Sequence, residues 1–124
     1  MVAPAGRLQV EDIAAREVHH TIIPDPGNGG TIDVSRGGVC NLTSVGAAET
    51  RSLPDPWFIG QKISFSFIAD AGDIIMTAVS PVNQTGNVLI TFDDIGEWIE
   101  LAGAWNVTDG WEWKVIGADG ATRS

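Results

Sequence analysis

The stretch Lys62-Ile-Ser-Phe-Ser-Phe-Ile68 alternates polar and apolar side chains from one residue to the next. Successive side chains of a β-strand point to opposite faces of a sheet, so its first isoleucine and both phenylalanines share one face, and its lysine and both serines share the other. This period of two predicts a strand rather than a helix. One face of the strand is therefore expected to be buried and the other to meet solvent.

Similar short apolar runs lie on both sides of this strand, separated by turn-forming residues. Beyond the turn Asp70-Ala-Gly-Asp73 comes Ile74–Val79, which we expect to form a hairpin with the first strand and to be covered on both faces. Two Pro-Asp-Pro triplets mark strand ends or linkers, because proline cannot donate to a strand ladder. Further strands are predicted at Thr31–Ser35, Val88–Phe92, Trp98–Leu101, Trp105–Thr108 and Trp111–Ile116.

About eight short strands, with turn signals every 8–12 residues or so, predict an all-β fold, a compact sandwich or barrel of short antiparallel strands. The first residues differ, because Val10, Ile13, Ala14 and Val18 fit helical spacing without a cap or a long periodic run. We therefore expect an extended N-terminal arm over residues 1–24 and a single β domain over residues 25–124. A chain of 124 residues leaves no room for a second domain.

The charge of the chain limits its partners. Sixteen acidic residues against seven basic ones give a formal net charge of −9, with no cluster of lysine and arginine. Phosphate backbones repel such a protein, so we expect no nucleic acid as a partner. No apolar run approaches the roughly 20 residues that cross a bilayer, so we expect no membrane partner. The N-terminal Met1–Arg7 lacks the apolar core of a signal peptide, which favours synthesis in the cytoplasm.

Residues for covalent catalysis are scarce. A catalytic nucleophile needs an oriented base, and the only histidines are the adjacent His19 and His20, whose side chains diverge on a strand. Cys40 is the only cysteine, so it can form neither an intramolecular disulfide nor a cluster of thiolate ligands, and we interpret it as a small buried apolar residue. The sequence therefore predicts a protein that is not an enzyme and carries no cofactor and no metal.

Carboxylates are more plentiful, and four of them crowd into eight residues: Asp93, Asp94, Glu97 and Glu100. Calcium favours several oxygen ligands, but the alternating ligands and central glycine of an EF-hand loop are missing. We interpret the cluster as a solvated acidic turn, and whether it binds calcium stays open. A small hydrolase that uses these carboxylates is an alternative, which requires a buried pair in a cleft.

Five tryptophans and no tyrosine are unusual in so short a chain. Tryptophan is enriched at interfaces and where sugars bind. Trp57 lies between Pro56 and Phe58 in a loop-like segment, so it is a candidate anchor for another molecule. Trp105 and Trp111 flank a hairpin turn at Asp109-Gly110, where they form either a sugar platform or a packing contact. Trp113 is predicted to lie in the core.

The residues that carry a family resemblance lie mainly in the second half of the chain: Glu49–Pro56, Gly60-Gln61, Ser80–Asn87, Thr91–Trp98 and Trp113–Gly120. They resemble small virion structural proteins of tailed bacteriophages, of the capsid decoration (cement) or head-fibre type. The likeness covers roughly residues 49–120 and includes no catalytic residue, whereas the role of residues 1–48 stays open. It implies a small β-rich protein, often trimeric, on the outside of the phage head.

The expected function is therefore to decorate and stabilise the outer face of a capsid, with the major capsid protein as partner and a homotrimer as the assembly. An acidic protein suits the outer face, because an inner lining would meet DNA. The alternative is a tail-fibre or receptor-binding module that holds sugars on exposed tryptophans. Candidate contacts with the capsid or a neighbouring subunit are Leu8, Val10, Ile13, Trp57, Trp105 and Trp111.

Overall fold

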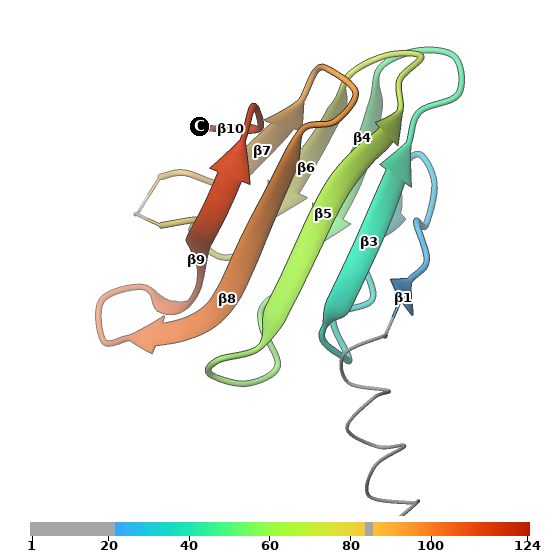
Figure 1. Ribbon diagram of the computed structural model, residues 1–124. Helices are drawn as coiled ribbons and strands as arrows, with labels where there is room; N and C mark the ends of the chain where they lie inside the picture. Colours follow the sequence, from blue (N-terminus) through green and yellow to red (C-terminus); the bar gives the residue numbers. More distant parts are fainter. Residues whose placement is uncertain (1–21, 84–85) are drawn as a thin grey trace, which may run out of the picture.

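The structure, a computed structural model, describes residues 22–83 and 86–124, which form two five-stranded sheets packed face to face (Figure 1). The predicted all-β sandwich is confirmed, and no helix occurs in the described residues. Of the predicted arm, residues 1–21 lie outside this description, while Ile22 and Ile23 already belong to a sheet. The strands are β1 Ile22–Ile23, β2 Gly30–Thr31, β3 Gly38–Thr43, β4 Glu49–Leu53, β5 Lys62–Ala69, β6 Ile74–Ala78, β7 Leu89–Phe92, β8 Trp98–Asn106, β9 Gly110–Asp119 and β10 Thr122–Arg123.

The chain crosses from one sheet to the other after each of its first five strands. One sheet has the order β1-β3-β5-β8-β9 and is called sheet A here, and sheet B has the order β10-β7-β6-β4-β2. As a result β1, β3 and β5 pair in parallel, and so do β2, β4 and β6. Antiparallel pairs join β6 to β7, β5 to β8, β8 to β9 and β7 to β10. The prediction of antiparallel strands is thus wrong for the N-terminal half and correct for the C-terminal half.

The predicted hairpin between β5 and β6 is wrong, because the two strands lie in different sheets. Their apolar sides are both buried, so they pack across the core instead of pairing edge to edge. The connecting turn is tied to the β3–β4 connection: the Ser44 hydroxyl donates to the Gly72 carbonyl (2.6 Å) and accepts from the Ala71 amide (2.8 Å). A Cβ on Gly72 would sit 2.3 Å from the carbonyl carbon of Ala47, so this close approach requires glycine.

Several strand boundaries also differ from expectation, and the strand predicted at Trp111–Ile116 is longer, Gly110–Asp119. The segments predicted separately at Trp98–Leu101 and Trp105–Thr108 are joined in one strand, β8, because the small residues between them stay in the ladder with β9. This strand ends at Asn106, so Val107 and Thr108 lie in the turn that follows. The register of the β8–β9 ladder shifts between Glu100 and Leu101, where β9 has one extra residue, Ile116. The strand predicted at Thr31–Ser35 is shorter, since only Gly30–Thr31 pairs with β4.

The core lies between the two sheets and contains the apolar side chains that alternation predicted. Both phenylalanines of β5 are fully buried, and the ring of Phe67 meets that of Phe92 edge to face at 6.3 Å between centroids. Trp113 is also fully buried, which confirms its predicted place in the core. So is Cys40, and burial raises the pKa of its thiol to about 12.

A buried ion cluster joins the β1–β2 connection to β4. The Arg51 side chain has no solvent exposure, and its Nε and Nη2 atoms donate to the two carboxylate oxygens of Asp25 at 2.7 and 3.0 Å. Its Nη1 lies 3.0 Å from the Glu49 carboxylate, and its Nη2 also donates to the Thr43 carbonyl. Burial alone would raise the pKa of Asp25, but the hydrogen bonds from Arg51 and from the Thr43 and Gly27 amides outweigh it and hold that pKa below its ordinary value of 3.8.

This lowered pKa predicts an acid-sensitive contribution to stability. A carboxyl whose pKa is lower in the folded state stabilises that state above its unfolded pKa, and the contribution is lost as the pH falls through the folded pKa. The stability difference between wild type and Asp25→Asn should therefore be largest near neutral pH and shrink below about pH 4. Urea unfolding of both proteins across this range measures it. A difference that stays constant down to pH 3 or so would contradict the assignment.

Candidate protein-interaction surface

Three of the five tryptophans, Trp57, Trp105 and Trp111, lie at one end of the sandwich, whereas Trp98, which is 39% exposed, begins β8 at the other end. The β4–β5 loop, residues 54–61, and the β8–β9 turn both lie at the lower end of the sandwich in Figure 1. The loop is bound to β8, because the Gly60 amide donates to the Gly103 carbonyl (2.8 Å) and the Gly103 amide to the Gln61 carbonyl (2.7 Å). We call this surface the tryptophan end, and it comprises Trp57, Phe58, Ile59, Trp105, Val107 and Trp111.

The β4–β5 loop presents three consecutive large apolar side chains to solvent. Trp57 is 65% exposed, Phe58 52% and Ile59 69%. Single exposed apolar residues are common on protein surfaces, but three in a row on one loop are the kind of feature that marks an interaction site. Sequence analysis identified Trp57 and missed its two neighbours, although the run Trp57-Phe58-Ile59 directly after Pro54-Asp-Pro56 was a visible signal.

Hydrogen bonds fix the backbone of this loop from within. The buried Gln61 side chain accepts from the Trp57 amide (2.7 Å) and donates to the Val34 carbonyl (2.6 Å). The indole of Trp113 donates to the Pro54 carbonyl at 3.0 Å. A Cβ on Gly103 would come within 2.6 Å of the Phe58 carbonyl oxygen, so the loop packs directly on the backbone of β8. These hydrogen bonds and this packing hold the loop backbone so that the side chains of Trp57, Phe58 and Ile59 face solvent.

The predicted hairpin at Asp109-Gly110 brings Trp105 and Trp111 together. They are partners in the β8–β9 ladder, and their rings meet edge to face, 5.4 Å between centroids and 82° between planes. The Asn106 side chain closes the turn by accepting from the amides of Thr108 and Asp109. Trp105 is 54% exposed and Trp111 is half-buried. Because the rings are nearly perpendicular, they do not form one flat platform for a sugar.

The opposite end of the sandwich is acidic. The carboxylates of Asp93, Asp94 and Glu97 approach within 4.8 Å of one another on the β7–β8 connection. The pKa of Glu97 is raised, because burial and the nearby Asp93 carboxylate both disfavour the charged form of Glu97. Glu100, which was expected in the same cluster, instead lies on the outer face of sheet A, beside Ser64 in the ladder. Asp93 and Asp94 are exposed, so the buried pair that the hydrolase alternative requires is not found at these two residues.

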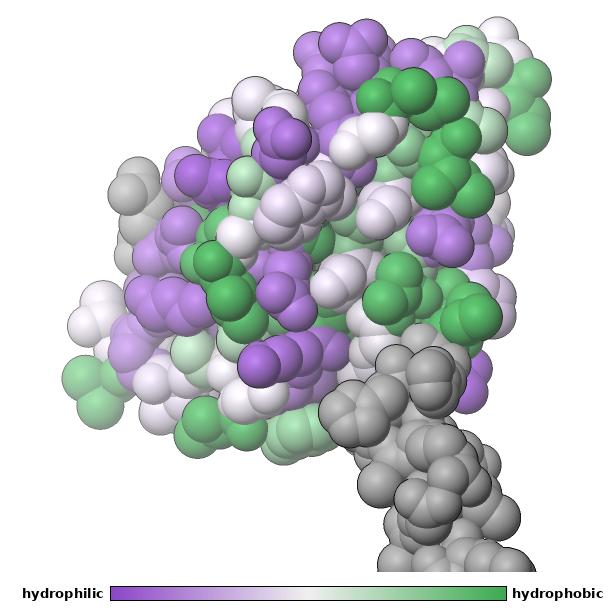
Figure 2. Space-filling model, in the orientation of Figure 1, coloured by the Kyte–Doolittle hydropathy of each residue, from purple (hydrophilic) through white to green (hydrophobic). Residues whose placement is uncertain are grey.

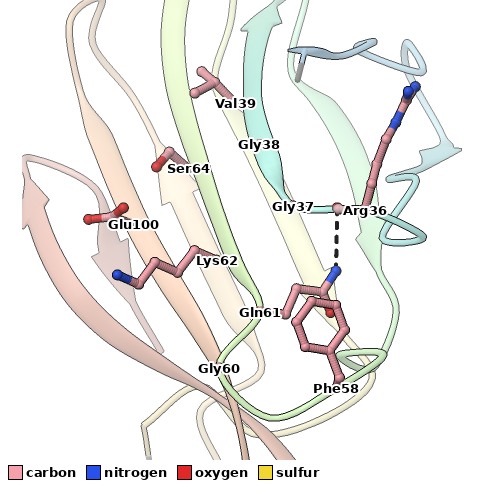
Figure 3. A pocket seen from close by; sticks show the side chains of 10 residues that line it. All are labelled: Arg36, Gly37, Gly38, Val39, Phe58, Gly60, Gln61, Lys62, Ser64 and Glu100. Atoms are coloured by element: carbon pink, nitrogen blue, oxygen red, sulfur yellow. Dashed lines mark hydrogen bonds between the residues drawn. The ribbon is translucent and has the colours of Figure 1, made fainter. Parts of the chain in front are cut away.

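A shallow hollow of about 570 Å³ lies on the outer face of sheet A, where β3 and β5 begin (Figure 3). Its lining combines Phe58 of the loop, Val39 of β3 and the polar side chains Lys62, Ser64 and Glu100. Elsewhere on this face, apolar residues form separate patches between polar ones and no single continuous area (Figure 2). The hollow exists partly because Gly37, Gly38 and Gly60, which line it, have no side chains. Sequence analysis missed it, because no pattern in the sequence shows that these glycines lie together.

The structure thus unites three of the predicted contact residues, Trp57, Trp105 and Trp111, at one end of an all-β sandwich. The other three, Leu8, Val10 and Ile13, lie outside the described residues, as do His19 and His20. The described residues contain no helix long and apolar enough to cross a membrane. No protein-family model matches the chain, and a search of curated proteins finds no match either. Function is therefore inferred from the geometry and from the resemblance over residues 49–120.

Proposed function

We propose that the protein is a virion structural protein that decorates the outer face of a tailed-phage capsid, with the major capsid protein as its partner. The observation that supports this best is the tryptophan end, where a loop held by internal hydrogen bonds exposes Trp57, Phe58 and Ile59. Tryptophan is among the residues most enriched at the energetic centres of protein interfaces. A rigid loop loses little conformational entropy when it binds, which favours affinity.

The charge distribution supports an orientation on the capsid. The tryptophan end faces the shell, and the acidic end, with Asp93, Asp94 and Glu97, faces solvent. Exposed carboxylates at the outer end keep neighbouring copies soluble and apart. Binding to the assembled shell, and not to free capsid subunits, stabilises the shell by mass action. We extend the proposal to a homotrimer, because a closed ring can cover apolar surface that one subunit leaves exposed.

Replacing Trp57 or Trp105 with alanine is expected to weaken capsid binding by about 30-fold each, the equivalent of roughly 2 kcal/mol at an interface centre. Both side chains are more than half exposed, so neither substitution should unfold the protein. Co-sedimentation with mature heads from which the protein has been stripped gives the affinity.

The matched control is Ile95→Ala, which removes an exposed apolar side chain at the acidic end. This variant should bind heads like wild type. Wild-type binding by the Trp57 and Trp105 variants, or an equal loss in the Ile95 variant, would contradict the proposed contact. Quenching of tryptophan fluorescence by cell-surface oligosaccharide, together with no binding to heads, would favour the receptor-binding alternative, for which exposed Trp57 is the supporting observation.

A further inference from the structure

The hollow on sheet A has the features of a site for a short peptide segment. Its volume, about 570 Å³, falls within the usual range for binding pockets of about 300–1,000 Å³. Phe58 and Val39 give it apolar surface, and three glycines leave backbone accessible. Lys62 and Glu100 stand on the same side of the hollow, opposite Phe58 (Figure 3). The site therefore combines apolar side chains with one basic and one acidic group.

The basic group in this hollow is available to a ligand. Only five described residues are lysine or arginine; Arg51 is buried, and Arg36 points away from the hollow, toward Asp33. Lys62 forms no ion pair with any described residue, although Glu100 lies on the same face of the sheet. An ammonium group beside apolar surface favours a ligand that is apolar and places a carboxylate at that point.

The chain itself contains such a segment, and its attachment point adjoins the hollow. Arg7-Leu-Gln-Val-Glu-Asp-Ile13 combines three large apolar side chains with a basic residue at its start and two adjacent carboxylates. Ile22, where the described chain begins, pairs in parallel with Val39, which lines the hollow. Ile22, the first described residue of β1, therefore lies at the same end of the sandwich as the hollow. Glu11 and Asp12 complement Lys62, and Arg7 complements Glu100.

We propose that this hollow is the docking site for Arg7–Ile13 of a second copy of the chain. The eight residues Ala14–Thr21 contain no glycine, proline, asparagine or aspartate, the residues that most often form reverse turns. A return of the arm to its own subunit would need such a reversal beside Ile22. Extended, eight residues span up to about 26–29 Å, enough to reach a neighbouring subunit. Repeated around a rotation axis, this head-to-tail contact closes a ring.

A charge-reversal series tests the docking. Lys62→Glu places a carboxylate against Glu11 and Asp12, and it should raise the dissociation constant of self-association by about tenfold or more. The pair Glu11→Lys and Asp12→Lys should have the same effect, and combining it with Lys62→Glu should restore assembly. Arg123→Glu makes the same charge change at an exposed site in sheet B and should assemble like wild type. Sedimentation equilibrium measures each constant.

Crosslinking identifies which copy supplies the arm. Chains carrying Val10→Cys are mixed with chains carrying Ser64→Cys, and oxidation should give a dimer that joins one chain of each kind. Native Cys40 is fully buried and does not compete. A monomeric wild-type protein, wild-type assembly by Lys62→Glu, or a Val10→Cys/Ser64→Cys double variant that crosslinks within one chain would overturn the inference.

The inference goes beyond the capsid proposal, and the two can fail separately. A monomer that binds heads with wild-type dependence on Trp57 would overturn the arm exchange and the homotrimer, but not the contact with the capsid. A protein that assembles through Lys62 and Glu11 but ignores heads would overturn only the capsid function.

Discussion

Replacing Arg51 with alanine is expected to lower the free energy of unfolding by about 3–5 kcal/mol, because it leaves two carboxylates without their partner in a dry site. The Glu49 side chain is 6% exposed and that of Asp25 13%, so water reaches only a small part of either carboxylate. The same substitution also removes the donors to the carbonyls of Thr43 and Thr50. Urea unfolding monitored by tryptophan fluorescence measures the change.

Two further variants make this experiment specific. Arg36→Ala removes an exposed pair with Asp33 at 3.9 Å, and it should change stability by no more than about 1 kcal/mol. The triple variant Asp25→Asn, Glu49→Gln, Arg51→Met removes all three charges together, and it should recover much of the stability lost by Arg51→Ala. Equal losses for Arg51→Ala and Arg36→Ala would show that the buried cluster does not join the β1–β2 connection to β4 as described.

Replacing Trp113 with alanine is expected to cost about 3–5 kcal/mol, the usual range for deleting a fully buried aromatic side chain. Trp113 also holds three segments together. Its amide donates to the Pro81 carbonyl, its carbonyl accepts from the Asn83 amide, and its indole donates to the Pro54 carbonyl ahead of the tryptophan end.

Trp113→Phe separates packing from hydrogen bonding. It keeps a buried ring but leaves the Pro54 carbonyl without its donor, for a loss of about 1–3 kcal/mol. Trp57→Ala is the matched control: it removes an exposed indole and should stay within about 0.5 kcal/mol of wild type. If Trp113→Ala and Trp57→Ala lost the same stability, the indole of Trp113 would not be the anchor of the β4–β5 loop.

The sequence predicted the alternation of buried and exposed side chains along single strands, but it did not predict which strands pair with each other. The pattern of Lys62–Ile68 identified its buried face correctly, because side-chain period depends only on local geometry. The same pattern could not show whether Ile74–Ala78 lies beside that strand or across the core from it. That choice depends on the turn between them, which is held by Ser44 from a distant part of the chain.

Single residues of the tryptophan end could be predicted from local sequence, but the way they come together could not. Trp57 stood out because prolines precede it, and Trp105 and Trp111 because a tight turn separates them. Their meeting at one end depends on hydrogen bonds between the β4–β5 loop and Gly103, which no local pattern records. The buried arginine was missed, although Glu49, Arg51 and Leu53 alternate on one face of β4, where a paired charge was the simplest interpretation.

The alternation of the first six strands between the two sheets also bears on how the chain acquires its structure. The only consecutive strands that pair with each other in the described residues are β6 with β7 and β8 with β9. Pairing between distant segments is slow, because the entropy of closing long loops must be overcome first. Translation therefore completes β3 and β4 before their partners β5 and β6 are made. Until the C-terminal hairpins form, the apolar runs of the N-terminal half are unprotected, and nascent chains are then most prone to aggregate.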